Sequence, residues 1–295
     1  MDGLLNIYKE KDFTSHDVVA VLRGITGQRK IGHTGTLDPQ AEGVLPVCLG
    51  KATRAADMLE DTTKEYRCTM LLGKTSDTED IWGTILSDHA VCIGESQAEE
   101  ALKSFLGSYD QIPPMYSARK VNGKKLYELA RSGKEIERAA RRVEIYELEI
   151  EEIEIPRIRF RVSCSKGTYV RSLCRDAGEK LGCGGLMESL TRTRAGMFRI
   201  EDALRLSEVR ELAESGRLAD RLIPIDRMFA PYPETVMDAG QQKYLENGNR
   251  LPAGSIPAGQ RVRVYDSERH FAGIYECRDG RWLYPVRFFY GESGR

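Results

Sequence analysis

Short apolar runs and helical apolar stripes alternate along this chain. The apolar run Val44–Leu49 is typical of a buried strand. From Arg157 to Cys164, arginine alternates with Ile, Phe and Val, which predicts a half-buried strand with a basic outer face. The pattern predicts further strands at 4–8, 65–73 and 143–155. It predicts one helix after a Thr14 or Ser15 cap and another that follows the loop at 166–174 and runs to about residue 181. Further helices are predicted over 54–59, 96–106, 126–131 and 207–215. Ser96 and Glu99 have capping-box spacing.

Two prolines, Pro231 and Pro233, interrupt the pattern and predict a domain boundary. The tail beyond them has a capped helix that starts near Asp238 and ends by Gly248, followed by strands around 261–265, 271–277 and 282–289. We therefore expect two domains, residues 1–229 and a small β-rich domain over 232–295.

One loop concentrates unusual residues around a single acid. It reads Gly32-His33-Thr34-Gly35-Thr36-Leu37-Asp38-Pro39, and it leads through Gly43 into the buried run. Glycine reaches backbone conformations closed to other residues, and Pro39 biases the preceding Asp38 towards extended geometry. The segment predicts a rigid loop that presents one carboxylate. An ordinary Asp-Pro turn is the alternative.

A lone carboxylate limits the chemistry available. Glycoside hydrolysis needs two carboxylates, whereas Asp38 alone can act as a covalent nucleophile or a single base. A neighbouring cation would hold it ionised, and Arg171 is a candidate for that partner. Asp38 is therefore the leading catalytic candidate.

Composition narrows the class of protein. The chain has 295 residues with 41% hydrophobic and 30% charged positions, as in soluble globular proteins. We expect no membrane segment and no signal peptide. The seven cysteines include no Cys-x-x-Cys pair and the four histidines are scattered, so we expect neither disulfides nor a metal site. A reducing cytoplasm fits this cysteine usage.

Charge is distributed unevenly, although the net charge is −1. Residues 119–142 contain nine basic and three acidic side chains, or +6, and residues 166–199 contain seven and three, or +4. Residues 76–100 contain seven acids and no Lys or Arg, or −7. Clustered positive charge is typical of proteins that bind phosphate-rich ligands, although such runs are also common on solvated faces. The first basic block follows Pro113-Pro114, which predicts an extended loop rather than a helix.

Two tyrosines have basic neighbours. Lys64 and Arg67 flank Tyr66, and Lys166 and Arg171 flank Tyr169. Aromatic faces beside cations stack and hold single-stranded bases, although either tyrosine alone also suits a core or rim position. His33, between two glycines, can stack or donate a hydrogen bond, or serve as a neutral loop residue. Phosphate-binding glycine loops and a Gly-x-Ser-x-Gly elbow do not occur in the sequence.

These residues resemble the TruB family of tRNA pseudouridine synthases. The carboxylate loop and Gly43-Val44-Leu45-Pro46 are similar to the catalytic motif of that family. The resemblance continues through Lys64-Glu65-Tyr66, Pro113-Pro114-Met115-Tyr116-Ser117-Ala118, Gly167-Thr168-Tyr169-Val170-Arg171-Ser172 and Leu190-Thr191-Arg192-Thr193-Arg194. It covers most of residues 3–229 in the right order.

The resemblance implies a bacterial enzyme that isomerises uridine 55 in the T arm of tRNA without a cofactor or metal. It implies an α+β catalytic domain with a central, mainly antiparallel sheet flanked by helices. A basic insertion at about 114–142 would close on the RNA as a thumb, and the tail would be a small PUA-like domain. We expect a monomer whose partner is tRNA.

The resemblance also implies roles for individual residues. Asp38 would be the nucleophile, paired with Arg171, and it would attack C6 of the base or C1′ of the ribose, or assist glycal formation. Tyr66 would stack on the target base, which Tyr169 and Leu190 would surround. His33 would occupy the space of the flipped nucleotides. RNA phosphates would be held by Arg54, Arg119, Lys120, Lys124, Lys125 and Lys166.

The residues alone are compatible with two other functions. An RNA-binding or chaperone protein with a purely structural carboxylate loop would share the basic blocks, and a folding role can accompany catalysis. A small-molecule glycosidase ranks last because it lacks a second carboxylate.

Overall fold

A computed structural model describes residues 1–60, 63–117, 119–121, 123–134 and 136–291. The helices are α1 (Ser15–Thr26), α2 (Ala56–Glu60), α3 (Glu95–Lys103), α4 (Leu126–Arg131), α5 (Val170–Lys180), α6 (Leu206–Glu214) and α7 (Gln242–Glu246). The short 3-10 helices are η1 (Gly50–Ala55), η2 (Ile200–Asp202), η3 (Leu218–Arg221), η4 (Ile225–Phe229) and η5 (Ala239–Gln241).

The strands fall into two main sheets and two hairpins. They are β1 (Gly3–Lys9), β2 (Ile31–His33), β3 (Glu42–Leu49), β4 (Lys64–Leu72), β5 (Lys74–Ser76), β6 (Ile85–Asp88), β7 (Gly107–Gln111), β8 (Lys120–Val121), β9 (Lys124–Lys125), β10 (Arg141–Glu154), β11 (Arg157–Cys164), β12 (Gly185–Ala195), β13 (Phe198–Arg199), β14 (Glu234–Val236), β15 (Leu251–Pro252), β16 (Arg261–Tyr265), β17 (Phe271–Cys277) and β18 (Trp282–Phe288).

The central sheet has the order β1-β3-β12-β4-β11-β10-β7, with β2 and β13 paired at its side. Its neighbours are antiparallel except β3 and β12, which run parallel over two residue pairs, Glu42 with Thr191 and Gly43 with Arg192. At this junction a Cβ on Gly43 would lie 2.3 Å from the Arg192 carbonyl oxygen, so only glycine fits. The predicted mainly antiparallel sheet is confirmed.

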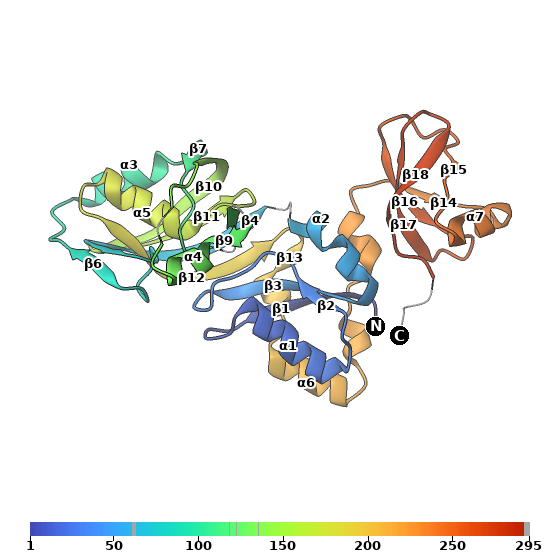
Figure 1. The fold of residues 1–295 in the computed structure, drawn as a ribbon, viewed down its shortest axis with the longest axis horizontal. Helices are drawn as coiled ribbons and strands as arrows, with labels where there is room; N and C mark the ends of the chain where they lie inside the picture. Colours follow the sequence, from blue (N-terminus) through green and yellow to red (C-terminus); the bar gives the residue numbers. More distant parts are fainter. Residues whose placement is uncertain (61–62, 118, 122, 135, 292–295) are drawn as a thin grey trace.

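Different helices cover the two halves of this sheet (Figure 1), and a hydrophobic core lies under each set of helices. One core joins β4, β11 and β12 to α3 and α5, with Phe160 and Leu173 fully buried. The other joins β1 and β3 to α1 and α6, with Val19 and Val209 buried. The carboxylate loop leads into β3, and the first two residues of β3, Glu42 and Gly43, pair with β12. The loop therefore lies where the two halves of the sheet meet.

A second sheet, in the order β14-β16-β17-β18-β15, begins at Glu234 and forms the C-terminal module, residues 234–291. Phe229 of η4 stacks on Phe271 of β17, with 6.2 Å between ring centroids. Phe289 belongs to the same hydrophobic cluster as Leu4 of β1 and Cys48 of β3, and Phe271 packs against that cluster. An apolar seam therefore joins the module to the rest of the chain.

Most predicted elements occur, but one detail of the sequence interpretation is wrong. The Ser96–Glu99 capping box is not used, because α3 begins at Glu95 and Gln97 accepts a hydrogen bond from the Gly94 N–H, at 2.9 Å. Thr14 does cap α1.

The central strand β12 was not predicted. Gly182–Gly185 reads as a flexible turn and the following residues as a basic block. Register shifts after Met187 and after Arg192 break the simple alternation that marks a strand.

Candidate active site

The loop that carries Asp38 connects β2 to β3. Gly35 has φ 69°, the left-handed conformation that glycine adopts readily. The Ser15 hydroxyl accepts from the Leu37 N–H at 2.9 Å and donates to the Leu37 carbonyl at 3.1 Å. Leu37 is buried, whereas the Asp38 side chain keeps 39% of its surface exposed. The loop thus holds its apolar residue in the core and leaves the carboxylate accessible.

Two buried cations hold this loop by its backbone. The Lys9 ammonium donates to the carbonyls of Pro39 at 2.9 Å, Phe13 at 2.6 Å and Glu10 at 3.0 Å. Burial lowers the pKa of Lys9 to about 8, and the nearby Asp38 charge opposes that shift. Arg192 donates to the carbonyls of Gly35 at 2.8 Å and Val44 at 2.7 Å. Backbone conformation on both sides of Asp38 is therefore tied to the sheet.

Arg171, the predicted partner, contacts both oxygens of the Asp38 carboxylate. Its Nε lies 2.9 Å from Oδ2, and its Nη2 donates to Oδ1 at 3.3 Å. The Arg171 side chain is only 4% exposed. A two-point contact between a guanidinium and a carboxylate fixes direction as well as charge. The predicted pairing of Asp38 with Arg171 is confirmed as a contact.

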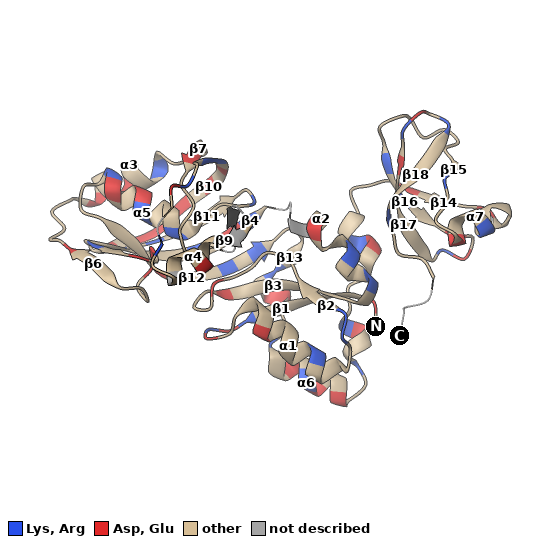
Figure 2. Ribbon diagram, in the orientation of Figure 1, with Lys and Arg blue, Asp and Glu red and all other residues tan. Residues whose placement is uncertain are grey.

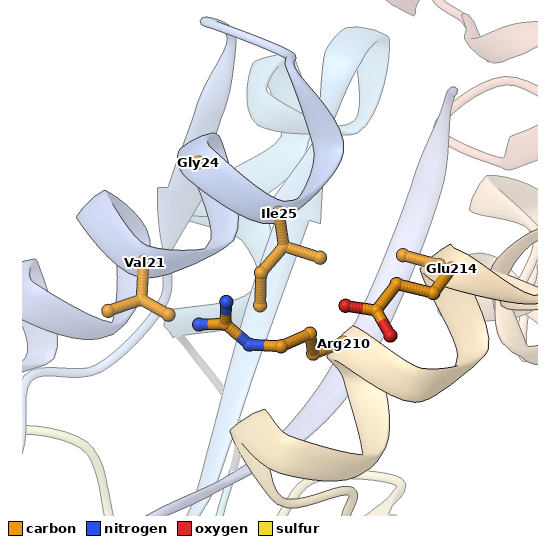
Figure 3. Close-up of a pocket in the computed structure, with 6 residues that line it drawn as sticks. Val21, Gly24, Ile25, Arg210 and Glu214 are labelled. Carbon is orange, nitrogen blue, oxygen red and sulfur yellow. The ribbon is translucent and has the colours of Figure 1, made fainter.

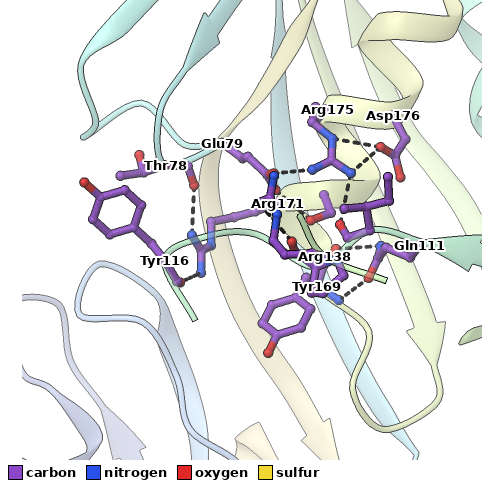
Figure 4. Close-up of polar contacts among 12 residues, drawn as sticks. Thr78, Glu79, Gln111, Tyr116, Arg138, Tyr169, Arg171, Arg175 and Asp176 are labelled. Atoms are coloured by element: carbon purple, nitrogen blue, oxygen red, sulfur yellow. Dashed lines mark hydrogen bonds and ion pairs between the residues drawn. The ribbon is translucent and has the colours of Figure 1, made fainter. Parts of the chain in front are cut away.

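Two backbone carbonyls complete the surroundings of Arg171 (Figure 4). Nη1 donates to the Thr78 carbonyl and Nη2 to the Tyr116 carbonyl, each at 2.8 Å. Thr78 lies in the turn between β5 and β6, and Tyr116 lies in the segment between β7 and β8. Arg171 on α5 therefore joins three separate loops around Asp38.

Tyr66 and Leu190 lie on adjacent strands close to this loop. Tyr66 of β4 is paired with Arg192 of β12, two residues from Leu190. Both side chains are buried and share a hydrophobic cluster with Leu37. Burial raises the pKa of Tyr66, and Arg192 acts in the opposite direction. The site therefore combines an accessible carboxylate with a buried apolar and aromatic wall.

Tyr169 and His33 are held mainly through backbone contacts. The Tyr169 N–H donates to Gln111 Oε1 at 2.8 Å, and the Gln111 amide donates back to the Tyr169 carbonyl at 3.0 Å (Figure 4). His33 ends β2 opposite Val47 and is half-buried. Burial lowers the pKa of His33 and Arg192 adds to the shift, so its imidazole is neutral at pH 7.

Comparison with known proteins decides the family. Residues 23–170 match the TruB family pseudouridylate synthase N-terminal domain, residues 171–230 match the tRNA pseudouridylate synthase B C-terminal domain, and residues 233–289 match the Pseudouridine synthase II TruB C-terminal domain. The chain belongs to the TruB family of pseudouridine synthases. This confirms the resemblance inferred from the motifs, together with the predicted class of enzyme.

Relatives within the TruB family are similar over nearly their full length. The tRNA pseudouridine synthase B of Lachnoclostridium phytofermentans is 49% identical, over 98% of this chain and 100% of the relative. The tRNA pseudouridine synthase B of Clostridium acetobutylicum is 47% identical, over 93% of this chain and 95% of the relative.

A protein chain in the solved structure of an H/ACA RNP bound to a substrate RNA containing 2'-deoxyuridine has a similar fold, with a TM-score of 0.74. It is 25% identical in sequence, and the match covers 98% of this chain and 85% of the chain in that structure. The α+β fold predicted for a TruB enzyme is thus confirmed.

Arg54 lies apart from the group around Asp38. The eight residues of β3, about 25 Å of strand, separate the carboxylate loop from η1, which carries Arg54. Arg54 donates to the Phe288 carbonyl at 2.9 Å, so it contacts the C-terminal module. Its predicted phosphate contact stays a prediction, at a place remote from the Asp38 carboxylate.

The basic insertion is described only in part. Its backbone forms the two short strands β8 and β9, which pair Lys120 with Lys125, followed by the helix α4. Arg119 is half-buried, whereas the side chains of Lys120, Lys124 and Lys125 lie outside the described parts of the structure. Lys166 is exposed in the loop that leads to α5. Their phosphate contacts stay predictions.

Sequence reasoning missed the residues that support the site. Lys9 and Arg192 act from within the core, and Thr78 and Tyr116 contribute through backbone carbonyls, which side-chain chemistry does not reveal. Residues 76–100 stood out in the sequence only as an acidic run. Asp80 in that run accepts from the Thr78 hydroxyl at 2.6 Å, and burial raises its pKa.

Among the described residues, no group of three or more His, Cys, Asp or Glu side chains is arranged to hold a metal ion. No helix in the described ranges is long and apolar enough to cross a membrane. A surface groove of about 560 Å3 lies between α1 and α6, lined by residues that include Arg210 and Glu214 (Figure 3), and its lining contains none of the predicted site residues.

Proposed function

We propose that this enzyme isomerises uridine 55 in the T loop of tRNA, with Asp38 as the catalytic carboxylate. The observation that supports it is the accessible Asp38 side chain, held at both oxygens by the buried Arg171. The curated relatives are named tRNA pseudouridine synthase B, which favours tRNA as the substrate.

The reaction breaks the N1–C1′ bond, turns the base, joins C5 to C1′ and releases the C5 proton. Every atom of the product comes from the uridine and the solvent, so no cofactor is required. Asp38 serves as the nucleophile at C6 or at C1′, or removes a sugar proton on a glycal route. Arg171 balances the charge of the carboxylate and aims both oxygens in each of these routes.

The surrounding residues fit a base that has left its stack. We assign Tyr66 to stacking on the target base and Tyr169 and Leu190 to the walls of its pocket. His33 takes the space of the flipped nucleotides, because its neutral ring can stack without a charge cost. The wall that Tyr66 and Leu190 form beside Asp38 supports this assignment.

Binding of the T arm involves the basic segments. We assign phosphate contacts to the insertion at about 114–142, acting as a thumb, and to Lys166 and Arg54. The proposed division is a catalytic domain over 1–229 and a PUA-like RNA-binding domain over 232–295. We further propose that the enzyme is a monomer of the cytoplasm.

Asp38→Asn tests the catalytic assignment. Because the variant keeps size but removes the nucleophilic charge, we expect turnover to fall at least about 10⁴-fold. Release of tritium from C5-labelled T-arm RNA measures turnover, and the dissociation constant for that RNA should stay within about twofold. Asp202→Asn, an exposed acid of η2, is the matched control. Turnover retained by Asp38→Asn would remove Asp38 from the chemistry.

Pseudouridine mapping tests the position. In tRNA from cells that lack this protein, pseudouridine should disappear at position 55 and return with the wild-type gene. Its persistence there, with loss elsewhere, would refute position 55 while leaving the enzyme class intact. If the Asp38→Asn variant helps tRNA to fold but forms no pseudouridine, the protein has a folding role that is separate from catalysis.

A further inference from the structure

The turn at residues 76–80 is clamped to α5 by one buried acid, Glu79. Its carboxylate accepts from the Ser172 hydroxyl at 2.6 Å and forms an ion pair with Arg175. Glu79 is only 8% exposed. An acid buried to this extent needs paired charge and hydrogen bonds, and both partners lie on α5, the helix that also carries Arg171 (Figure 4).

The backbone at Glu79 adopts a conformation that a residue with a side chain seldom takes. Its φ is 64°, in the left-handed region. Such a conformation persists only where surrounding contacts enforce it. Here the enforcing contacts are the carboxylate clamp and the Met187 N–H, which donates to the Glu79 carbonyl at 3.1 Å.

The same peptide group links Glu79 to the active site. The Thr78 carbonyl and the Glu79 N–H belong to one peptide bond. Its N–H donates to the Ser76 carbonyl at 3.3 Å, and its carbonyl accepts from Arg171 Nη1 at 2.8 Å. Rotation of this peptide plane would withdraw an acceptor from Arg171 and leave the guanidinium less constrained beside Asp38.

We propose that Glu79 is a positioning residue that acts on Asp38 through Arg171. The clamp on α5 holds the peptide between residues 78 and 79, that peptide aims the Arg171 guanidinium, and the guanidinium orients the two Asp38 oxygens. The inference rests on Asp38 as the catalytic residue in the proposed function. Glu79 itself touches neither Asp38 nor the reacting atoms.

Single-turnover kinetics test this proposal. Tritium release is measured on a pool of unmodified tRNA transcripts labelled at C5 of every uridine, so that the readout does not depend on which uridine reacts. Glu79→Ala should lower the rate about 10- to 100-fold, the usual cost of misplacing a catalytic group by about 1 Å. Affinity for the transcripts should stay within about twofold.

Glu79→Gln, which keeps the shape and the Ser172 hydrogen bond, should retain a rate between Glu79→Ala and wild type and guards against failure of the alanine variant to fold. Glu188→Gln removes an ion pair with Arg157 on the outer face of the sheet and should keep the wild-type rate.

A double-mutant cycle separates positioning from general support of the fold. If Glu79 acts through Arg171, adding Glu79→Ala to Arg171→Lys should lower the rate by less than about twofold beyond Arg171→Lys alone. Independent factors that multiply would overturn the proposal, as would a wild-type rate in both Glu79 variants or a parallel loss of affinity. The Asp38→Asn variant, assayed alongside, shows separately whether the catalytic assignment itself holds.

Discussion

The carboxylate loop and the longer basic insertion at about 114–142 belong to one sheet domain, yet they are built very differently. The loop is tied to the core on every side, by Lys9, Ser15 and Arg192 through its backbone and by Arg171 at its one exposed acid. Its geometry is therefore set before any substrate arrives, as a catalytic group requires.

Among the described residues, three arginine side chains contact backbone carbonyls at the start of the insertion, and Leu126 in its middle is fully buried. Arg175 donates to the Ile112 carbonyl at 3.1 Å, Arg171 to the Tyr116 carbonyl, and Arg138 to the Pro113 carbonyl at 3.2 Å. Its basic residues are spread over two-residue strands and a six-residue helix. Under the proposed function, the positive charge that contacts RNA phosphates needs only a rough location, whereas the carboxylate proposed to react needs an anchored one.

Removing the loop's internal anchor should have the largest effect. Arg192→Met leaves the Gly35 and Val44 carbonyls without charged donors in a buried site, so we expect the free energy of unfolding to fall by roughly 3–5 kcal/mol. Urea unfolding measures it. Arg199→Met, on the exposed side of β13, is the control. A loss below about 1 kcal/mol would mean that the loop does not depend on this cation.

Neutralising the insertion should change binding and leave stability alone. With Gln at Arg119, Lys120, Lys124 and Lys125 together, the slope of log affinity for T-arm RNA against log salt should flatten by about 3, at 0.7–0.9 per phosphate contact. Unfolding free energy should move by less than about 0.5 kcal/mol. An unchanged salt slope would exclude these side chains from phosphate contacts and end the contrast between the two segments.

His33 beside the loop should make stability sensitive to acid. Burial lowers its folded-state pKa below the ordinary 6.5, so between these two values the unfolded chain binds more protons and stability falls as pH falls. Unfolding measured from pH 7 to 5 should show a smaller decline in His33→Gln than in wild type. His89→Gln, at an exposed position, should decline as wild type does; equal declines in all three would place the acid sensitivity elsewhere.

The smallest effect should come from the arginines of β11. Arg157 and Arg159 lie 2.8 Å from Glu188 and Glu152, and Arg161 pairs with Glu149, so the predicted basic outer face is in fact charge-balanced (Figure 2). Replacing all three with Gln should change RNA affinity by less than about twofold and leave its salt slope intact. A slope change matching that of the insertion variant would show that clustered charge alone decides binding.

Much of the fold was predictable because its signals are local. Thr14 caps α1 as expected, and β3 and β11 follow the buried run and the alternating pattern. The strand β12 escaped because bulges disturb its alternation, and it is the strand that joins the two halves of the sheet. For the site, the sequence suggested Asp38, Arg171 and Arg54. The first two are in contact, whereas Arg54 lies beyond the far end of β3, in η1.

By itself the sequence determined a stiff loop with one acid, two basic blocks and the family motif. Those features depend on backbone restrictions of Gly and Pro and on local charge, which act over a few residues. Only the tertiary structure decided that Asp38 meets Arg171, 133 residues away, and that Lys9, Arg192 and Glu79 hold the parts in place. Such contacts arise from the packing of whole elements, because buried cations and acids are stable only where distant backbone and side chains converge to satisfy them.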